Sequence, residues 1–287
     1  MFLEIKNPNP IDYSKFNNRK SGISGFMRIK NEEQFIETVV LSWINYLDEL
    51  VIIYNDCNDK TPIILKRLEK KYPKKIKLFH YLPVVYPFNT PKFSKTDIDS
   101  IHSFCFYSNF ALSKTSYDKC VKIDGDHIGI PQALKRIYNY LTEKNMKDSV
   151  YYFSAFNLWM FNRRLYFDLN NPYCGNGDVY YFNSSDKHKF IKHPLNKNLE
   201  FLRISSKYQY DIGFIFLHTH YMKKTFLKNF KKTNESWIPY THNNIKKVNC
   251  NFYISKILDN GKYIRYMVPK HKELYFNATG KDLKDLQ

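Results

Sequence analysis

The sequence predicts an α/β fold with a mixed, mostly parallel sheet and helices on its faces. Short apolar runs typical of buried strands alternate with amphipathic segments in the first half of the chain. A β-α-β-α-β order of this kind produces parallel strands joined by crossover helices. After residue 148 the pattern changes to short strand-like segments, which we expect to complete the sheet. The chain has 287 residues, enough for one large domain with a small additional module.

The individual elements follow from apolar spacing and from helix-start signals. Asn31 precedes two glutamates, and an asparagine cap with acidic residues in the first turn is typical of a helix start. The expected helices cover residues 31–47, 61–71, 99–114 and 131–144. The expected strands are residues 23–29, 49–54, 76–82, 120–123, 149–153, 179–182 and 212–217.

Composition excludes several protein classes. Hydrophobic residues make up 43% of the chain, so the protein is folded and not disordered. The five cysteines form no CxxC pair, which argues against a zinc ribbon or a redox dithiol and fits a reducing cytosol. The sequence has neither an apolar run of about 18 residues nor a signal-peptide core, so we expect a cytoplasmic protein.

The chain carries a formal net charge of +18, which favours anionic partners: nucleic acid, acidic phospholipid or phosphorylated substrates. A solvated basic surface explains much of the same charge. Residues 221–232 mix Lys with aromatic and aliphatic residues. This segment fits either a peripheral contact with the anionic inner face of the cytoplasmic membrane or a helix with a solvated Lys face, which we favour.

Three polar clusters lie at the ends of expected strands, at residues 28–32, 55–59 and 124–127. Ligands of open α/β sheets bind beyond the carboxyl ends of the strands, so we expect the clusters to converge on one site. The residues in them that we expect to contact a phosphorylated ligand are Arg28, Lys30, Asn31, Glu32, Asn55, Asp56, Asp59 and Asp124.

The third cluster predicts a divalent metal site. Asp124 and Asp126, separated by a glycine directly after a strand, present the oxygen ligands that Mg²⁺ or Mn²⁺ shares with substrate phosphates. Such an ion stabilises a diphosphate leaving group. A later apolar strand ends in His218 and His220. Because alternate residues share a strand face, one of these histidines fits a metal ligand, although a structural histidine is an equally good interpretation.

Other cluster residues have structural interpretations that stay open. Asp56 and Asp59 fit hydrogen bonds to the ribose or uracil of a nucleotide, but Asp59 also fits the cap of the following helix. Arg28 fits either a phosphate contact or a surface residue at a strand end.

Several of these segments resemble those of a known enzyme family. Residues 26–32 and 54–59 are similar to the start of GT-A glycosyltransferases of the family-two type. The closer likeness is to bacterial β-1,4-N-acetylgalactosaminyltransferases that build lipooligosaccharide outer cores. Those enzymes carry segments similar to residues 28–32, 54–59, 122–127 and 217–219, and to the Gly177-Asp178 pair before a strand.

The resemblance implies a GT-A-type, Rossmann-like sheet and a small helical or irregular C-terminal extension. It implies that Asp124 and Asp126 are the DxD pair, that His218 is a further metal ligand and that Asp56 contacts the nucleotide. It also implies an inverting transfer of a sugar (GalNAc, GlcNAc or Gal) from a UDP-sugar. The acceptor is then an oligosaccharide or a lipid-linked saccharide of a bacterial surface glycan: lipooligosaccharide, lipopolysaccharide or capsule.

We expect the chain to divide into three parts: an N-terminal arm at residues 1–20, a catalytic domain at 21–220 and a basic extension at 221–287. Within the catalytic domain, residues 21–145 form the nucleotide-binding half and residues 146–220 the acceptor half. An inverting transferase also needs a base for the acceptor hydroxyl. Asp178 is our first choice, with Asp211 and His220 as alternatives.

Two other functions explain part of the pattern. An Mg²⁺-dependent nucleotidyltransferase also uses paired carboxylates, but it requires a Gly-rich phosphate loop near the first strand, and the sequence has none. A basic nucleic-acid-binding protein is supported by charge alone and leaves the three strand-end clusters unexplained. We therefore expect no nucleic-acid partner.

Overall fold

The structure is a computed structural model that describes residues 2–143, 146, 149–168, 173–174, 180–224 and 237–239. Asp178 and nearly all of the expected C-terminal extension lie outside the described residues. In the part of the chain that is described, no helix is long and apolar enough to cross a membrane.

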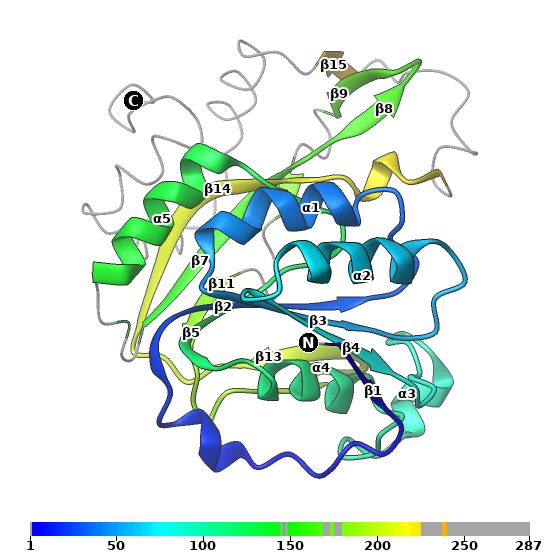
Figure 1. Ribbon diagram of the computed structural model, residues 1–287, viewed down its shortest axis with the longest axis vertical. Coiled ribbons are helices and arrows are strands. Elements are labelled where there is room, and N and C mark those ends of the chain that lie inside the picture. Colours follow the sequence, from blue (N-terminus) through cyan, green and yellow to red (C-terminus); the bar gives the residue numbers. More distant parts are fainter. Residues whose placement is uncertain are drawn as a thin grey trace.

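A ten-stranded sheet forms the centre of the molecule, in the order β1-β4-β3-β2-β5-β11-β7-β14-β6, with β10 beside β7 (Figure 1). Five neighbouring strands are parallel. They are β1 (Phe2–Ile5), β4 (Ile76–Tyr81), β3 (Glu49–Tyr54), β2 (Lys20–Ile29) and β5 (Tyr117–Lys122). The remaining strands, in both directions, are β11 (Tyr180–Asn183), β7 (Ser149–Asn157), β14 (Tyr208–His218), β6 (His127–Gly129) and β10 (Tyr173–Cys174).

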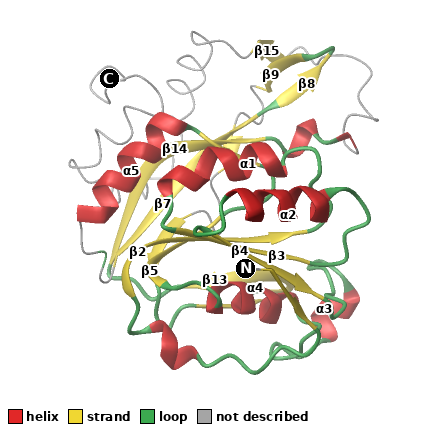
Figure 2. Cartoon of the chain, viewed as in Figure 1, coloured by secondary structure: helices red, strands yellow, loops and turns green. Residues whose placement is uncertain are grey.

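Helices cover both faces of this sheet (Figure 2). One face carries α1 (Ile36–Trp43, continued by the 3-10 turn Ile44–Tyr46), α2 (Thr61–Lys71) and α5 (Pro131–Glu143). The other face carries α4 (Phe104–Ser113) and the hairpin of β12 (Lys189–His193) and β13 (Asn196–Arg203), with α3 (Pro91–Lys95) beside them. Every residue of β3 is buried, as expected for a strand covered on both faces. The observed topology confirms the predicted mixed, mostly parallel sheet flanked by helices.

The structure differs from the sequence prediction at several elements. Helix α1 begins at Ile36 and not at Asn31, whose positive φ of 56° does not fit the extended backbone of a helix cap. The N-terminal residues include β1, which pairs with β4 at the sheet edge, and a 3-10 turn at Tyr13–Phe16. Helix α4 begins at Phe104 and not at residue 99, because the side chains of Asp97 and Ser100 accept backbone N–H groups and hold a turn there. Strands β12 and β13 were not expected, since β13 is mostly exposed and has no apolar run. Two further unexpected strands, β8 (Trp159–Phe161) and β9 (Arg164–Asp168), pair with each other and with β15 (Trp237–Pro239).

Candidate functional site

The three polar clusters meet at one edge of the sheet. Strand β2 pairs in parallel with both β3 and β5, so the carboxyl ends of all three strands point the same way. They open onto a cavity of about 550 Å³. The predicted site residues that line it are Arg28, Lys30, Glu32, Asn55, Asp124, Asp126, His218 and His220.

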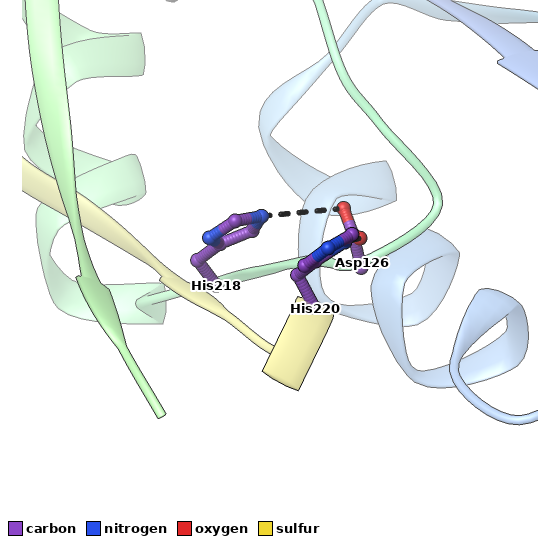
Figure 3. Close-up of side chains that lie close together, drawn as sticks. All are labelled: Asp126, His218 and His220. Carbon is purple, nitrogen blue, oxygen red and sulfur yellow. Dashed lines mark ion pairs between the residues drawn. The ribbon is translucent and has the colours of Figure 1, made fainter. Parts of the chain in front are cut away.

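Asp126 is the centre of the site and is only 9% exposed. His218 Nε2 lies 3.9 Å from its Oδ1, and His220 Nδ1 lies 3.5 Å from its Oδ2 (Figure 3). One ligand atom from each of these three residues falls within 4.8 Å of the others, so together they could hold a metal ion. His218 ends β14 and His220 opens the 3-10 turn His220–Met222, which places both rings beside the loop after β5.

His218 presents an unprotonated nitrogen to Asp126. Its Nδ1 lies 2.8 Å from Oδ1 of Asn157, an acceptor, so Nδ1 carries the proton and donates. Burial lowers the pKa of His218 to about 4, which keeps the ring neutral at physiological pH. A ring held through Nδ1–H, with Nε2 free of its proton, is the usual arrangement of a metal-binding histidine.

Asp124 lies next to Asp126 and is held by basic neighbours. Lys122 Nζ lies 3.0 Å from its Oδ2, and His127 Nε2 lies 3.7 Å from the same oxygen. The backbone N–H of Asp124 donates to His127 Nδ1. Burial opposes the ionisation of Asp124 and Asp126, but these neighbours, together with His220 and Lys223 at Asp126, hold both pKa values well below the ordinary range. Both carboxylates are therefore charged at neutral pH.

Glu32 and Lys223 complete the charged cluster. Lys223 Nζ lies 2.7 Å from Glu32 Oε1 and 2.8 Å from Asp126 Oδ2. Burial raises the pKa of Glu32 to about 7, with Asp126 and Asp124 adding to the effect and Lys223 opposing it. The pKa of Lys223 is raised, because the two carboxylates outweigh the cost of burying its charge.

Local packing fixes the loop that carries the two aspartates. A Cβ on Gly125 would lie 2.5 Å from Glu32 Cγ, so a larger residue at this position would force the Glu32 side chain or the loop to move. The Trp43 indole donates to the carbonyl of His127, and both the N–H and the hydroxyl of Thr219 donate to the carbonyl of Asp126. The loop is therefore tied to α1 and to the segment that carries both histidines.

Arg28 lies on the wall of the cavity with its charge already paired. Its guanidinium lies 2.5 Å from Glu200 of β13, with side chains that are 7% and 8% exposed. It also contacts the Ser108 hydroxyl, and Phe104 lies 4.8 Å from it, measured to the ring centroid. Arg28 thus anchors the unexpected hairpin to α4, and a direct phosphate contact would require this pair to open.

The cluster after β3 is partly structural. Asn55 is buried and donates to the carbonyls of Tyr81 and Pro83. Both oxygens of Asp59 accept backbone N–H groups, one from Thr61 and one from Glu33. Asp59 therefore joins the loop after β2 to the start of α2, although the N-cap of α2 is Lys60 and not Asp59.

Two further residues of the clusters lie outside the cavity lining. Asp56 is exposed and pairs with Lys30 at 2.6 Å. The Asn31 side chain accepts the N–H of Asn58, which joins the loops after β2 and β3.

The three candidates for the catalytic base have different positions. Asp178 lies outside the described residues. Asp211 pairs with Tyr152 and His218 with Asn157, so at about 3.3 Å per residue the backbone of Asp211 lies on the order of 15 Å along the sheet from the site. His220 lies at the site, beside Asp126.

The structure adds four residues that sequence reasoning did not assign to the site: Lys122, Asn157, Glu200 and Lys223. Asn157 ends β7, so the strand-end rule would have found it if the strand had not been expected to stop at residue 153. Lys223 carried no local signal, because it lies in the Lys-rich segment that we interpreted as solvated.

Solved structures that are similar to this chain include glycosyltransferases, with low sequence identities and low TM-scores. S. aureus TarS 1-349 is 12% identical, with 89% of this chain and 78% of that chain covered and a TM-score of 0.40. Glucosyl-3-phosphoglycerate synthase from Mycobacterium tuberculosis, in complex with Mn²⁺, UDP and phosphoglyceric acid, is 17% identical, with 54% and 50% covered and a TM-score of 0.31. The mannosyltransferase PcManGT from Pyrobaculum calidifontis, in complex with GDP-Man and Mn²⁺, is 15% identical, with 51% and 39% covered and a TM-score of 0.33.

This chain spans half or less of the latter two structures. A search of curated proteins gave no match. The family assignment therefore rests on a sequence-family match, and the fold class rests on the observed sheet.

The family model described as beta-1,4-N-acetylgalactosaminyltransferase (CgtA) matches residues 11–173, more than half of the chain. The match covers β2, β3 and β5 with the polar clusters that follow them, and it confirms the resemblance drawn from those segments. The sheet has the mixed, mostly parallel topology expected of a GT-A-type enzyme. The chain belongs to the beta-1,4-N-acetylgalactosaminyltransferase (CgtA) family of glycosyltransferases.

Proposed function

We propose that the protein is an inverting, metal-dependent glycosyltransferase that moves a sugar from a UDP-sugar to a saccharide of a bacterial surface glycan. The observation that carries the proposal is the cluster of Asp124, Asp126, His218 and His220 on a cavity at the carboxyl ends of parallel strands. Ligands of α/β sheets bind at such an edge, and paired carboxylates there suit a metal-bound diphosphate.

The donor atoms fit Mn²⁺ better than Mg²⁺. Asp126 supplies carboxylate oxygens, and His218 and His220 supply imidazole nitrogens within 4.8 Å. Manganese accepts such a mixed set, whereas magnesium prefers oxygen ligands and retained water. When bound, the ion would supply charge stabilisation to the departing diphosphate. Asn157 would hold the His218 ring in the tautomer that ligation requires.

The rest of the cavity suits a nucleoside. Its wall on the side of α4 is apolar and includes Val85, Phe88 and Phe104, against which a base can pack. Lys30 and Asp56, at the ends of β2 and β3, would lie near the ribose and the phosphates. Arg28 would act by holding the hairpin and Phe104 in place, because Glu200 already pairs with its charge.

The sequence offers three candidates for the base, and we propose Asp178. His220 lies against Asp126, which suits a metal ligand, and the backbone of Asp211 lies along the sheet from the site. Asp178 therefore stays our first choice for the group that deprotonates the acceptor hydroxyl. GalNAc is the first candidate for the donor sugar because it is named in the family description, with GlcNAc and Gal as alternatives.

Turnover of a donor panel tests the proposal. The protein is incubated with Mn²⁺ and UDP-, GDP- or CMP-sugars, with and without saccharide acceptors, and the anomeric configuration of the product is read by NMR. We expect Mn²⁺-dependent release of UDP from a UDP-sugar and a product of inverted configuration. Turnover of GDP- or CMP-sugars alone would contradict the donor assignment. A product of retained anomeric configuration would contradict an inverting mechanism with a single base.

Thermal shift separates this function from its two alternatives. Stabilisation by UDP that requires Mn²⁺ is expected of the transferase. Salt-sensitive stabilisation by duplex DNA, with none by UDP and Mn²⁺, would favour a nucleic-acid-binding protein. Incorporation of a nucleoside monophosphate into product would favour a nucleotidyltransferase.

A further inference from the structure

The Lys223 ammonium lies between two carboxylates of the site. Its distances are 2.7 Å to Glu32 Oε1 and 2.8 Å to Asp126 Oδ2. Glu32 and Asp126 are 16% and 9% exposed, so both oxygens meet this cation in a largely dry environment. His220 Nδ1 lies 3.5 Å from the same Asp126 oxygen. The arrangement is a cation position built from two carboxylate oxygens and an imidazole.

A divalent ion on Asp126 Oδ2 would compete with this ammonium. Two cations within ordinary contact distance of one oxygen repel each other strongly in a low-dielectric site. Either the ion binds elsewhere on Asp126, or Lys223 leaves when it binds. If Lys223 leaves, the oxygen of Glu32 that it neutralised becomes available to the ion.

The backbone around Lys223 is held in place, whereas its side chain is long and partly exposed. The Gln34 side chain donates to the carbonyl of Met222 and accepts the N–H of Lys224, so both neighbours of Lys223 are tied to the segment before α1. The Lys223 side chain is 21% exposed and has four rotatable bonds. Its ammonium can therefore reach solvent without movement of the main chain.

We propose that Glu32 is an additional ligand of the divalent cation and that the Lys223 ammonium occupies this position until the cation displaces it. The inference rests on the proposed function, because it places the ion of that function at Asp126. It makes metal binding an exchange of one cation for another. The affinity for Mn²⁺ alone is then set partly by Lys223.

Binding of Mn²⁺ without nucleotide tests the exchange. Free Mn²⁺ is measured by electron paramagnetic resonance in the full-length wild type, in Lys223→Met and in the matched control Lys224→Met, whose lysine is exposed and adjacent. If the ammonium fills the position about nine-tenths of the time, Lys223→Met binds Mn²⁺ about tenfold more tightly, because apparent affinity scales with the competent fraction. Lys224→Met stays within about twofold of wild type, since an exposed charge is screened.

The outcomes separate the inference from the proposed function. Equal or weaker Mn²⁺ binding by Lys223→Met overturns the inference and leaves the metal site intact. If neither the wild type nor Lys223→Met binds Mn²⁺, or if Mn²⁺ binding survives Asp126→Asn, the proposed metal site is wrong and the inference is wrong with it. Equal tightening in Lys224→Met would show a general effect of charge and would also overturn the exchange.

The role of Glu32 is tested in the Lys223→Met background, because in that variant Glu32 no longer pairs with the Lys223 ammonium. Adding Glu32→Gln is expected to weaken Mn²⁺ binding about tenfold, as loss of a ligand or its close support does. Adding Glu37→Gln, which changes an exposed carboxylate on α1, is the control. An unchanged affinity in the Glu32→Gln double variant would remove Glu32 from the ligand set.

Amine labelling of the wild type gives a measurement that is independent of affinity. Reductive methylation of Lys223, quantified by mass spectrometry, is expected to increase several-fold when Mn²⁺ saturates the protein. Lys224 serves as the internal reference. Unchanged or reduced labelling of Lys223 would contradict its displacement.

Discussion

Two buried carboxylates at opposite ends of the parallel sheet have different surroundings. Glu49 begins β3 and is 4% exposed, and Asp126 follows β5 and is 9% exposed. Glu49 accepts hydrogen bonds from the Ser24 hydroxyl and the Ser116 backbone, and pairs with Lys77 at 2.6 Å. Asp126 has two histidines and a lysine around its carboxylate, beside a cavity.

The difference lies in what each set of partners can do. The partners of Glu49 are a hydroxyl on β2, a backbone N–H directly before β5 and a lysine on β4, so its carboxylate serves stability. Although burial opposes its charge, these bonds hold the pKa of Glu49 below its ordinary value. The partners of Asp126 are groups that bind metals or can be exchanged for them. The same residue chemistry is therefore structural at the amino end of the strands and suited to a ligand at the carboxyl end.

The largest expected effect is from Asp126→Asn, which removes the charge at the centre of the site and keeps its shape. We expect Mn²⁺-dependent sugar transfer to fall at least about 100-fold, since metal stabilisation of a leaving group contributes several kcal/mol. The circular dichroism spectrum should be unchanged. Full activity in this variant would exclude Asp126 from the metal site.

Glu49→Gln is expected to destabilise the fold and leave Mn²⁺ binding unchanged. Lys77 is 37% exposed and can return to water, so the loss comes mainly from the charged hydrogen bonds, about 2 kcal/mol. The measurement is urea unfolding at pH 7. If Glu49→Gln were as stable as the wild type, Glu49 would not stabilise the fold, and the proposed difference between Glu49 and Asp126 would be wrong.

Lowering the pH sharpens the same comparison. The folded pKa of Glu49 lies below the ordinary value of 4.5, so the unfolded chain takes up this proton first. The contribution of Glu49 is present above about pH 4.5 and is lost as the pH falls through its folded pKa. The stability difference between wild type and Glu49→Gln should therefore shrink below pH 4.5, and a constant difference would contradict the ion-pair explanation.

Asn157→Ala tests the support of the site with a smaller effect. Asn157 is buried and accepts the Nδ1–H of His218. Loss of such support typically costs 10- to 100-fold in metal affinity, and we expect about tenfold weaker Mn²⁺ binding by calorimetry. Unchanged affinity would indicate that His218 does not ligate through Nε2.

Lys30→Met is expected to have the smallest effect on stability. Lys30 and Asp56 are 49% and 68% exposed, so their ion pair contributes less than about 1 kcal/mol to folding. The affinity for UDP should nevertheless fall several-fold if Lys30 lies near the phosphates. A large loss of stability with unchanged UDP affinity would mean that the pair of Lys30 and Asp56 stabilises the fold, as Glu49 does, and does not contribute to nucleotide binding.

Local sequence patterns predicted the parts of the fold and site that depend on neighbouring residues. A buried strand followed by a polar cluster was recognisable at Arg28, Asn55 and Asp124, and pairing of β2 with β3 and β5 brings these clusters together. Partners from distant elements carried no such pattern. Glu200 reaches Arg28 from an exposed hairpin, and Lys223 reaches Glu32 across most of the chain, so only the tertiary structure reveals either contact.

The central claim is that the carboxyl-end cluster binds a nucleotide through a divalent metal. Titration calorimetry of UDP into the wild type, once with Mn²⁺ and once with a chelator, tests it most directly, with Asp126→Asn alongside. We predict UDP binding that is strong with Mn²⁺, at least tenfold weaker with the chelator, and insensitive to Mn²⁺ in Asp126→Asn. Equal UDP affinity with and without Mn²⁺ in the wild type would contradict the claim.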